Sequence, residues 1–180
     1  MRKPTLIALA LFFVLGAFAL FLEKGDTSGL IRITPTPTTY LAFAASNEEI
    51  DKLAVYSSGN ELIAVRILPS GWRVVKPLSV EADPGIIDEM IAAIQDIKVL
   101  RVLPANLLDA DIGTGDNANV RIEFTYSSGL SEKILVGNRA STGSGYYARL
   151  SNGDAVLIRT FSVETITDLF QQVFLESVSK

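Results

Sequence analysis

Apolar side chains recur at helical spacing in one stretch near the middle of the chain. They are Ile86, Ile87, Met90, Ile91, Ile94 and Ile97. Acidic and amide side chains lie between them, as on the solvent side of an amphipathic helix. Asp83 and Pro84 stand directly before this stretch. The aspartate carboxylate can accept free N–H groups of a first helical turn, and proline has no N–H to leave unpaired there. The sequence predicts a helix that begins at Pro84 and is capped by Asp83.

A short strand carrying the only tryptophan precedes this helix. Gly71 allows a turn, and Trp72, Val74 and Val75 favour a strand. Pro77 ends the strand, because the residue before a proline avoids the helical region. Strand alternation directs Trp72 toward the helix, so we expect its side chain to be buried between the two elements.

An exposed aromatic platform is the alternative to a buried tryptophan. Trp72, Tyr146 and Tyr147 together have the side chains of a sugar-binding or peptide-binding surface. If the two adjacent tyrosines lie in a strand, one of them faces outward. Tyr146 and Tyr147 are therefore the candidate binding surface, whereas Trp72, Asp83 and Pro84 are expected to be structural.

Alternation of apolar and polar residues predicts strands on both sides of the helix. The first half contains a hairpin, with Leu53 and Val55 before a turn at 57–60 and Ile63, Val65 and Ile67 after it. A strand at 99–103 is ended by Pro104. The second half has strands at 120–126, up to Gly137, at 146–150 and at 156–158, with Asn152-Gly153 as a hairpin turn. A last helix is predicted from Ser162, its N-cap, with Val163, Ile166, Leu169, Phe170, Val173 and Phe174 on its apolar face.

The predicted fold class is α+β, with antiparallel strands and two helices packed on one face of the sheet. The two halves also share short sequence matches. Tyr-Ser-Ser-Gly occurs at 56–59 and at 126–129, and Ser-Gly before an aromatic residue occurs at 70–72 and at 144–146. A tandem repeat of a strands-then-helix unit is one interpretation of these matches, and chance recurrence of common turn residues is the other.

The N-terminus carries the localisation signal. Arg2 and Lys3 precede an unbroken apolar run from Leu6 to Leu22, long enough for a short membrane-spanning helix. We predict one uncleaved N-terminal transmembrane helix, a single-pass signal anchor at residues 1–24. Ala17-Phe18-Ala19 also resembles a signal-peptide cleavage site, and a buried soluble helix is a third interpretation. The basic flank favours a cytoplasmic N-terminus, which places the rest of the chain outside the cell membrane.

Residues 25–39 read as a linker rich in proline and threonine, and residues 40–180 as one extracytoplasmic domain. All 20 acidic residues and all but two of the 16 basic residues lie beyond the apolar run. An acidic domain without a basic run argues against nucleic-acid binding and against adsorption to anionic lipid.

The chain contains no cysteine and no histidine, which excludes disulfides, thiolate chemistry and any site that needs imidazole. Asp109, Asp111 and Asp116 suggest a calcium loop, but Gly113, Thr114 and Val120 stand where an EF-hand needs ligands and its glycine. A solvated loop at 109–119 is the better interpretation. The Gly/Ser-rich residues 138–145 lack the ending of a phosphate loop. We expect no catalytic residue, cofactor or metal.

A longer set of residues resembles a known family. Gly71-Trp72-Arg73-Val74, Lys76-Pro77, Ala82-Asp83 before an isoleucine-rich helix, Ile134-Leu135-Val136-Gly137 and Gly143 to Arg149 together resemble the bacterial family catalogued as domain of unknown function 4340. The resemblance implies a membrane-anchored envelope protein, of a kind sometimes found beside an ABC transporter of the gliding type. The resemblance implies no activity and no catalytic residues.

These observations predict a membrane-anchored extracytoplasmic binding or scaffolding module, with envelope transporter subunits as its expected partners. The alternative is an envelope hydrolase that uses carboxylates, for which Asp109, Asp111, Asp116, Glu81 and Asp83 are the available groups. The sequence favours the binding module because Asp83 is explained by helix capping.

Overall fold

The computed structural model describes residues 40–43, 49–67, 71–116 and 118–179. Contacts divide the chain into Met1–Thr36 and Pro37–Lys180, and all of the described residues lie in the second unit. The predicted membrane segment at 6–22 and the linker at 25–39 lie outside the described residues. Within the part that is described, no helix is both long and apolar enough to cross a membrane.

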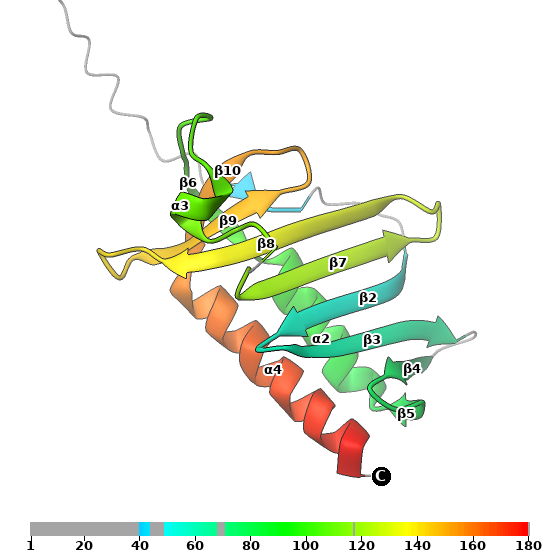
Figure 1. The fold of residues 1–180 in the computed structure, drawn as a ribbon. Coiled ribbons are helices and arrows are strands. Elements are labelled where there is room, and N and C mark those ends of the chain that lie inside the picture. The colour runs from blue at the N-terminus through cyan, green and yellow to red at the C-terminus, as the bar shows by residue number, and fades with distance from the viewer. Residues whose placement is uncertain (1–39, 44–48, 68–70, 117, 180) are drawn as a thin grey trace, which may run out of the picture. The chain divides into compact units, whose positions relative to one another are not determined.

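Ten strands form one sheet in which every neighbouring pair is antiparallel, in the order β1-β6-β10-β9-β8-β7-β2-β3-β4-β5. The strands are β1 (Tyr40–Leu41), β2 (Ile50–Ser57), β3 (Asn60–Ile67), β4 (Gly71–Lys76), β5 (Val80–Ala82), β6 (Lys98–Val102), β7 (Val120–Tyr126), β8 (Ser131–Arg139), β9 (Gly145–Leu150) and β10 (Ala155–Arg159). Figure 1 shows the sheet with most of these strands labelled.

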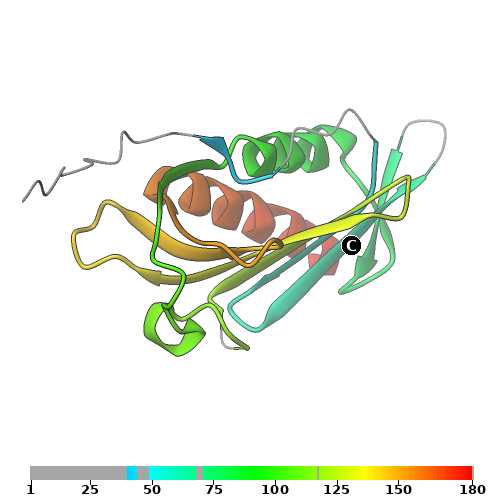
Figure 2. The same cartoon turned by 90° about the horizontal axis from the view of Figure 1, so that it is seen from above.

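Three helices are described: α2 (Pro84–Gln95), α3 (Asp109–Ile112) and α4 (Thr160–Ser179). The long helices α2 and α4 contact each other and lie on the same side of the sheet (Figures 1 and 2). The short helix α3 lies on the opposite side, near β8, β9 and β10 (Figure 2). We call the side with α2 and α4 the helix face and the other side the open face.

The strand order places two four-stranded meanders edge to edge. β2 to β5 are followed by α2, and β7 to β10 are followed by α4. The first strands of the two meanders, β2 and β7, pair with each other in the middle of the sheet. Leu53 lies opposite Phe124 and Val55 opposite Ile122 in this pair, and all four side chains are buried. The centre of the sheet therefore joins the two halves of the chain through its most buried residues.

The predicted fold class is wrong: the described residues form a single ten-stranded antiparallel sheet with three helices. Strands account for 45% and helices for 27% of the described structure, so the domain is mainly sheet. The sequence missed β1, β5 and α3 because elements of two to four residues are too short to show a period. It also could not show that the two halves share one sheet, since strand pairing depends on distant residues.

The core lies between the sheet and the pair α2 and α4. In β7 the side chains of Val120, Ile122, Phe124 and Tyr126 are buried and the residues between them are half-buried, which is the alternation expected of a sheet covered on one side. From α2 the buried side chains are Ile87, Met90, Ile91 and Ile94, and from α4 they are Val163, Ile166, Phe170, Val173 and Ser177.

The segment around the tryptophan folds as a strand followed by a capped helix. Asp83 is the N-cap of α2, and its carboxylate accepts the N–H of Gly85 at 2.8 Å. Trp72 lies in β4 and is 3% exposed. Its indole Nε1 donates to the Asp88 carboxylate on α2 at 3.0 Å, and the guanidinium of Arg66 lies 4.8 Å from the ring centre. This tryptophan therefore ties β4 to α2 and is not available as an exposed platform.

The last helix begins two residues before the predicted cap. Ser162 lies inside α4, which starts at Thr160 directly after Arg159 of β10. The predicted N-cap at Ser162 is wrong because β10 runs into the helix without the intervening turn that an N-cap residue would occupy.

Candidate functional site

The connection between β6 and β7 folds back over the open face. Its helix α3 ends at Gly113, which has a φ of 72°. A positive φ of this kind is readily adopted by glycine and ends helices commonly. At the other end, a carboxylate oxygen of Asp111 accepts the N–H of Leu108 at 3.4 Å. The residues predicted as a solvated loop thus contain one turn of helix with its own caps.

A second, smaller core fixes this connection to the sheet. Leu103, Ile112 and Ala155 are buried together, and Leu107 and Tyr147 pack against them. The backbone at the end of α3 lies directly on β8, because a Cβ atom at Gly137 would overlap the carbonyl oxygen of Ile112. Gly137 is therefore required for the close approach of these two segments.

Arg149 on β9 holds the same connection through Asp109 and Leu107, and it also binds Gly153 in the β9–β10 turn. Its Nε donates to a carboxylate oxygen of Asp109 at 2.8 Å, one terminal nitrogen donates to the carbonyl of Leu107 at 2.9 Å, and the other donates to the carbonyl of Gly153 at 3.1 Å. Asp109 also accepts the hydroxyl of Thr114 at 2.7 Å, and Thr114 is fully buried. A guanidinium shared by a carboxylate and two carbonyls sets the position of α3 geometrically.

These bonds lower the pKa of the Asp109 carboxyl below its ordinary value of 3.8, first through the Thr114 hydroxyl and then through Arg149. Both donors favour the ionised form. Asp109 is therefore an anion at neutral pH, and its Oδ1 accepts from both Thr114 and Arg149. A carboxyl in this state is unsuited to donate a proton as a general acid.

The attachment of α3 should depend on pH at the acid end. Because the folded pKa of Asp109 is lowered, its contribution is complete above about pH 3.8 and is lost as the pH falls through the lowered value. We expect the NMR signals of Thr114 and Ile112 to shift in that acid range. In Asp109→Asn this titration should be absent, and in Asp168→Asn, on the exposed side of α4, it should persist. A titration that survives in Asp109→Asn would contradict this assignment.

A polar cleft lies between this connection and the β2–β3 turn on the open face. Its volume is about 790 Å³, within the range of small-molecule sites. We call it the loop cleft. Four separate segments line it: the β2–β3 turn with Tyr56 and Glu61, the connection with Asp109 and Asp116, β7 with Arg121 and Glu123, and β8 with Lys133 and Leu135.

The floor of the loop cleft is an ordered set of polar contacts. The guanidinium of Arg121 lies 3.6 Å from the centre of the Tyr56 ring, and its Nε lies 3.4 Å from a carboxylate oxygen of Glu123. Lys76 donates to Glu61 at 2.6 Å. This bond, followed by one from the Tyr56 hydroxyl, lowers the pKa of Glu61, whereas the Glu61 bond raises the pKa of Tyr56. The floor therefore keeps its charged groups paired with one another.

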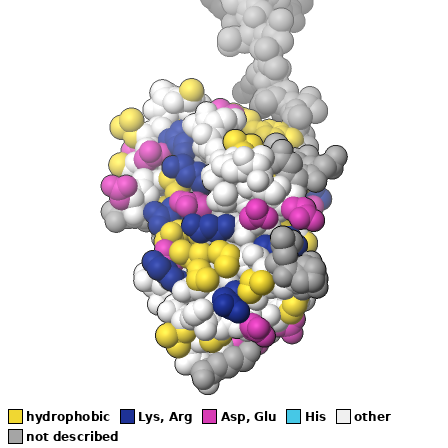
Figure 3. Space-filling model, turned by 90° about the vertical axis from the view of Figure 1, so that its right-hand side faces the viewer, with side chains coloured by type: hydrophobic (Ala, Val, Ile, Leu, Met, Phe, Trp, Pro, Cys, Tyr) yellow, Lys and Arg dark blue, Asp and Glu magenta, His cyan; other side chains and the backbone are white. Residues whose placement is uncertain are grey.

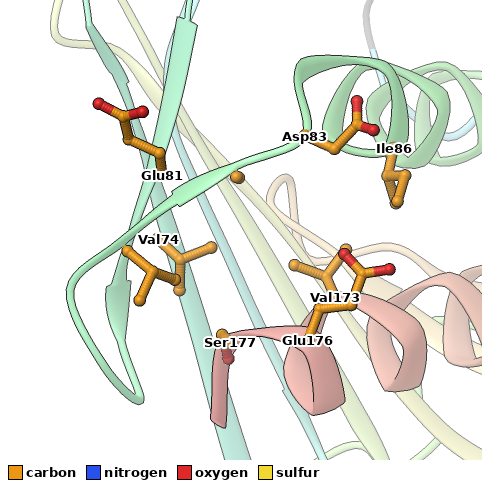
Figure 4. Close-up of a pocket in the computed structure, with 9 residues that line it drawn as sticks. Val74, Glu81, Asp83, Ile86, Val173, Glu176 and Ser177 are labelled. Carbon is orange, nitrogen blue, oxygen red and sulfur yellow. The ribbon is translucent and has the colours of Figure 1, made fainter. Parts of the chain in front are cut away.

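Two other hollows lie in the described structure. The one between β4, β5, α2 and α4 has a volume of about 10 Å³, which is room for one water molecule. Figure 4 shows that Glu81 points away from it, although Val74, Val173 and Ser177 line it. A second hollow of about 430 Å³ adjoins the loop cleft across the turn at Ser57–Gly59 and includes Tyr146.

The structure separates the residues that the sequence grouped as a binding surface. Tyr146 packs against the main core on the helix face, whereas Tyr147 packs against the small core beneath α3. Both side chains are half-buried. The two tyrosines therefore do not form one surface, because neighbours in β9 point to opposite faces.

Sequence reasoning singled out Asp109 and Asp116, weighed a calcium loop against a solvated loop and favoured the solvated loop, and it missed Tyr56, Arg121 and Arg149 as site residues. Among the described residues, no group of three or more acidic side chains is placed to hold a metal ion. The missed residues alternate with apolar ones in β2, β7 and β9, so each had the pattern of an ordinary solvent-facing strand position. The sequence has no local signal that brings them to one cleft.

Comparison with known families identifies the chain. The model of the family described as a domain of unknown function (DUF4340) matches residues 72–164, more than half of its 180 residues. The chain belongs to this family. The DUF4340 match begins at Trp72 and includes α2, α3 and β7 to β10, so it covers Asp109, Arg121 and Lys133 of the loop cleft. The β2–β3 turn lies before it.

No curated protein and no solved structure matches the chain. The family description states no activity, ligand or partner.

Proposed function

We propose that this DUF4340 protein is a membrane-anchored extracytoplasmic binding module and that the loop cleft is its binding site. The observation that supports this proposal is the construction of the cleft. Its walls come from four segments, and the segment carrying Asp109 is fixed by Arg149, by the Gly137 contact and by a core of its own. A cleft held in one shape binds with little loss of conformational entropy.

The polar groups of the cleft are arranged for recognition. Glu61 and Asp109 are ionised and accept hydrogen bonds from Lys76 and Arg149. Asp116 and Lys133 line the same cleft from two different segments, the connection and β8. They form no ion pair among the described residues. A ligand with both a donor-rich and an acceptor-rich end would satisfy this pair of charges.

We also propose the location and the partner that the N-terminal sequence and the family resemblance imply. The apolar run at 6–22 anchors the chain in the cell membrane, the domain faces the outside, and the bound partner is a subunit of an envelope transporter. The acidic composition of the domain supports recognition of protein surfaces rather than nucleic acid.

One experiment in intact cells tests the location and the site together. The chain has no cysteine, so Ser58→Cys in the β2–β3 turn gives a single thiol at the mouth of the cleft. A maleimide photo-crosslinker that cannot cross the cytoplasmic membrane should label this thiol. We expect light to join it to a discrete envelope protein, and we expect Asp116→Ala with Lys133→Ala to remove that product.

Ser141→Cys is the matched control, because Ser141 is an exposed turn residue between β8 and β9. It should be labelled equally and give no discrete product. If neither thiol is labelled in intact cells, the proposed location is wrong. If both thiols give the same products, or if the product from Ser58→Cys survives the cleft substitutions, the loop cleft is not the binding site.

A further inference from the structure

The two sides of the sheet carry different charges. Helices α2 and α4, which form the helix face, contain Asp88, Glu89, Glu164, Asp168 and Glu176 and no Lys or Arg. Registers across β8, β7, β2, β3, β4 and β5 define which residues share the open face, because directly opposed residues point to the same side. One row across it contains Thr125, Lys52, Val65, Arg73 and Glu81, and the next contains Lys133, Glu123, Ala54, Ile63 and Lys76.

The uncovered part of the open face has an apolar centre. Ile63, Val65 and Ile67 follow one another on this side of β3, and Ile67 is 37% exposed. Val75 lies at the bulge beside Ile63 and is 38% exposed. The connection that carries α3 covers the other half of the open face, over β8 and β9. Ile63, Val65 and Ile67 therefore form an apolar strip, here called the β3 patch, that no described segment covers.

Basic side chains frame the β3 patch. Lys52 and Arg73 lie on either side of Val65, and both are exposed. Among the described residues, Lys52, Arg73 and Lys133 form no ion pair, whereas Lys76 is paired with Glu61 and Arg121 with Glu123. Figure 3 shows Lys and Arg side chains, with acidic side chains among them, beside exposed hydrophobic side chains on one side of the molecule. Within this described part of the sheet, Glu61 and Glu123 are thus paired, Glu81 on β5 lies beside Arg73 without an ion pair, and Lys52, Arg73 and Lys133 give the surface an excess of unpaired basic groups.

We propose that the β3 patch docks an acidic amphipathic helix of a partner protein. The inference rests on the proposed function as a binding module and adds a second contact surface with a stated partner chemistry. Apolar side chains at helical spacing on the partner would cover Ile63 and Val65, and its acidic side chains would meet Lys52 and Arg73. Three strands spaced about 4.8 Å apart are about as wide as one helix.

A second copy of this chain does not fit the patch equally well. The acidic helix face and the β3 patch lie on opposite sides of the same sheet. Docking one copy's helix face on the next copy's patch would be a head-to-tail contact, which extends without closing unless a rotation forms a ring. A helix from another protein would neutralise Lys52 and Arg73 without producing such an open-ended assembly.

The test uses the full chain in nanodiscs of zwitterionic lipid and a fluorescent synthetic peptide. The peptide is an 18-residue helix former with Leu on one face and Glu on the other, and a second peptide has Lys in place of Glu. Fluorescence anisotropy should show binding of the acidic peptide that weakens with added salt. Lys52→Gln with Arg73→Gln should weaken this binding at least tenfold, and the Lys peptide should not bind.

Arg101→Gln with Arg139→Gln is the matched control. Both arginines are exposed and lie away from the patch, and their replacement removes two positive charges, as the Lys52 and Arg73 variant does. The control should change the affinity less than twofold. Equal weakening by the two double variants, or no binding of the acidic peptide, would overturn the proposal. Binding to anionic vesicles without binding to the peptide would replace it by a lipid surface, and self-association lost in the Lys52 and Arg73 variant would replace it by a second copy.

This result can be separated from the test of the loop cleft. Asp116→Ala with Lys133→Ala should abolish the crosslink from position 58. If the loop cleft alone binds the crosslinked protein, the same crosslink should form in the Lys52→Gln, Arg73→Gln variant. Peptide binding without a crosslink would support the β3 patch and contradict the loop cleft.

Discussion

Replacing Trp72 by alanine should lower the free energy of unfolding by roughly 3–5 kcal/mol. Trp72 is 3% exposed and lies in the main core between β4 and α2. Its removal leaves a large cavity and takes the indole N–H from the Asp88 carboxylate. It also exposes the face of the Arg66 guanidinium that lies over the ring. A loss of this size is a large fraction of the stability of an ordinary domain. Chemical denaturation followed by circular dichroism measures it.

Trp72→Phe is the matched control, because it keeps an aromatic ring and removes the indole N–H. Its cost should be smaller, with about 1.5–3 kcal/mol from the lost hydrogen bond to the Asp88 carboxylate. Since Trp72 is the only tryptophan, the wild-type emission reports this site alone, and it should be blue-shifted and poorly quenched by acrylamide. Red, easily quenched emission together with an unchanged Trp72→Ala denaturation curve would place the ring in solvent.

Replacing Gly137 by alanine should detach α3 from the sheet. The added Cβ would overlap the carbonyl of Ile112 and the backbone of Gly113. Backbone atoms cannot rotate away as a side chain can, so the end of α3 has to move. Overpacking of this kind costs about 1–3 kcal/mol. We expect amide exchange to increase at Ile112, Gly113 and Thr114, with little change in β2.

Gly71→Ala is the control for this substitution, because the nearest atom to its added Cβ, the carbonyl of Ile67, is 3.9 Å away. It should leave exchange at α3 unchanged. If Gly137→Ala also leaves the protection of Ile112 and Thr114 unchanged, α3 does not rest on β8 as the structure has it.

Local pattern alone located most of the longer elements. Helix α2 begins at the predicted Asp83-Pro84 start, and β7 occupies the alternating residues 120–126. The predicted Asn152-Gly153 turn lies between β9 and β10. These features depend on neighbours within one turn or one strand. The fold class was wrong because it depends on which strands pair, and the β2–β7 pair joins residues from opposite halves of the chain.

The candidate site was less predictable for the same reason. Arg149 and Asp109 are 40 residues apart, and nothing near either of them indicates that they meet. Tyr56 and Arg121 are directly opposed only because β2 and β7 are neighbours. Asp109 and Asp116 were noticed as a cluster of carboxylates, but their partners were not, so a metal was considered where Arg149 supplies the positive charge.

The central β2–β7 pair has a consequence during synthesis of the chain. Leu53 and Phe124 lie opposite each other and are 71 residues apart, so β2 emerges from the ribosome roughly 4–14 s before its partner at 5–20 residues per second. Throughout that interval β2 has one free edge, which other chains can pair with. Contacts of this long range also slow folding, because the entropy of closing the loop is lost before the pairing is gained. The β2 edge of the first meander therefore stays unpaired until β7 has been synthesised. During that time the nascent chain folds correctly only if this edge does not pair with another copy.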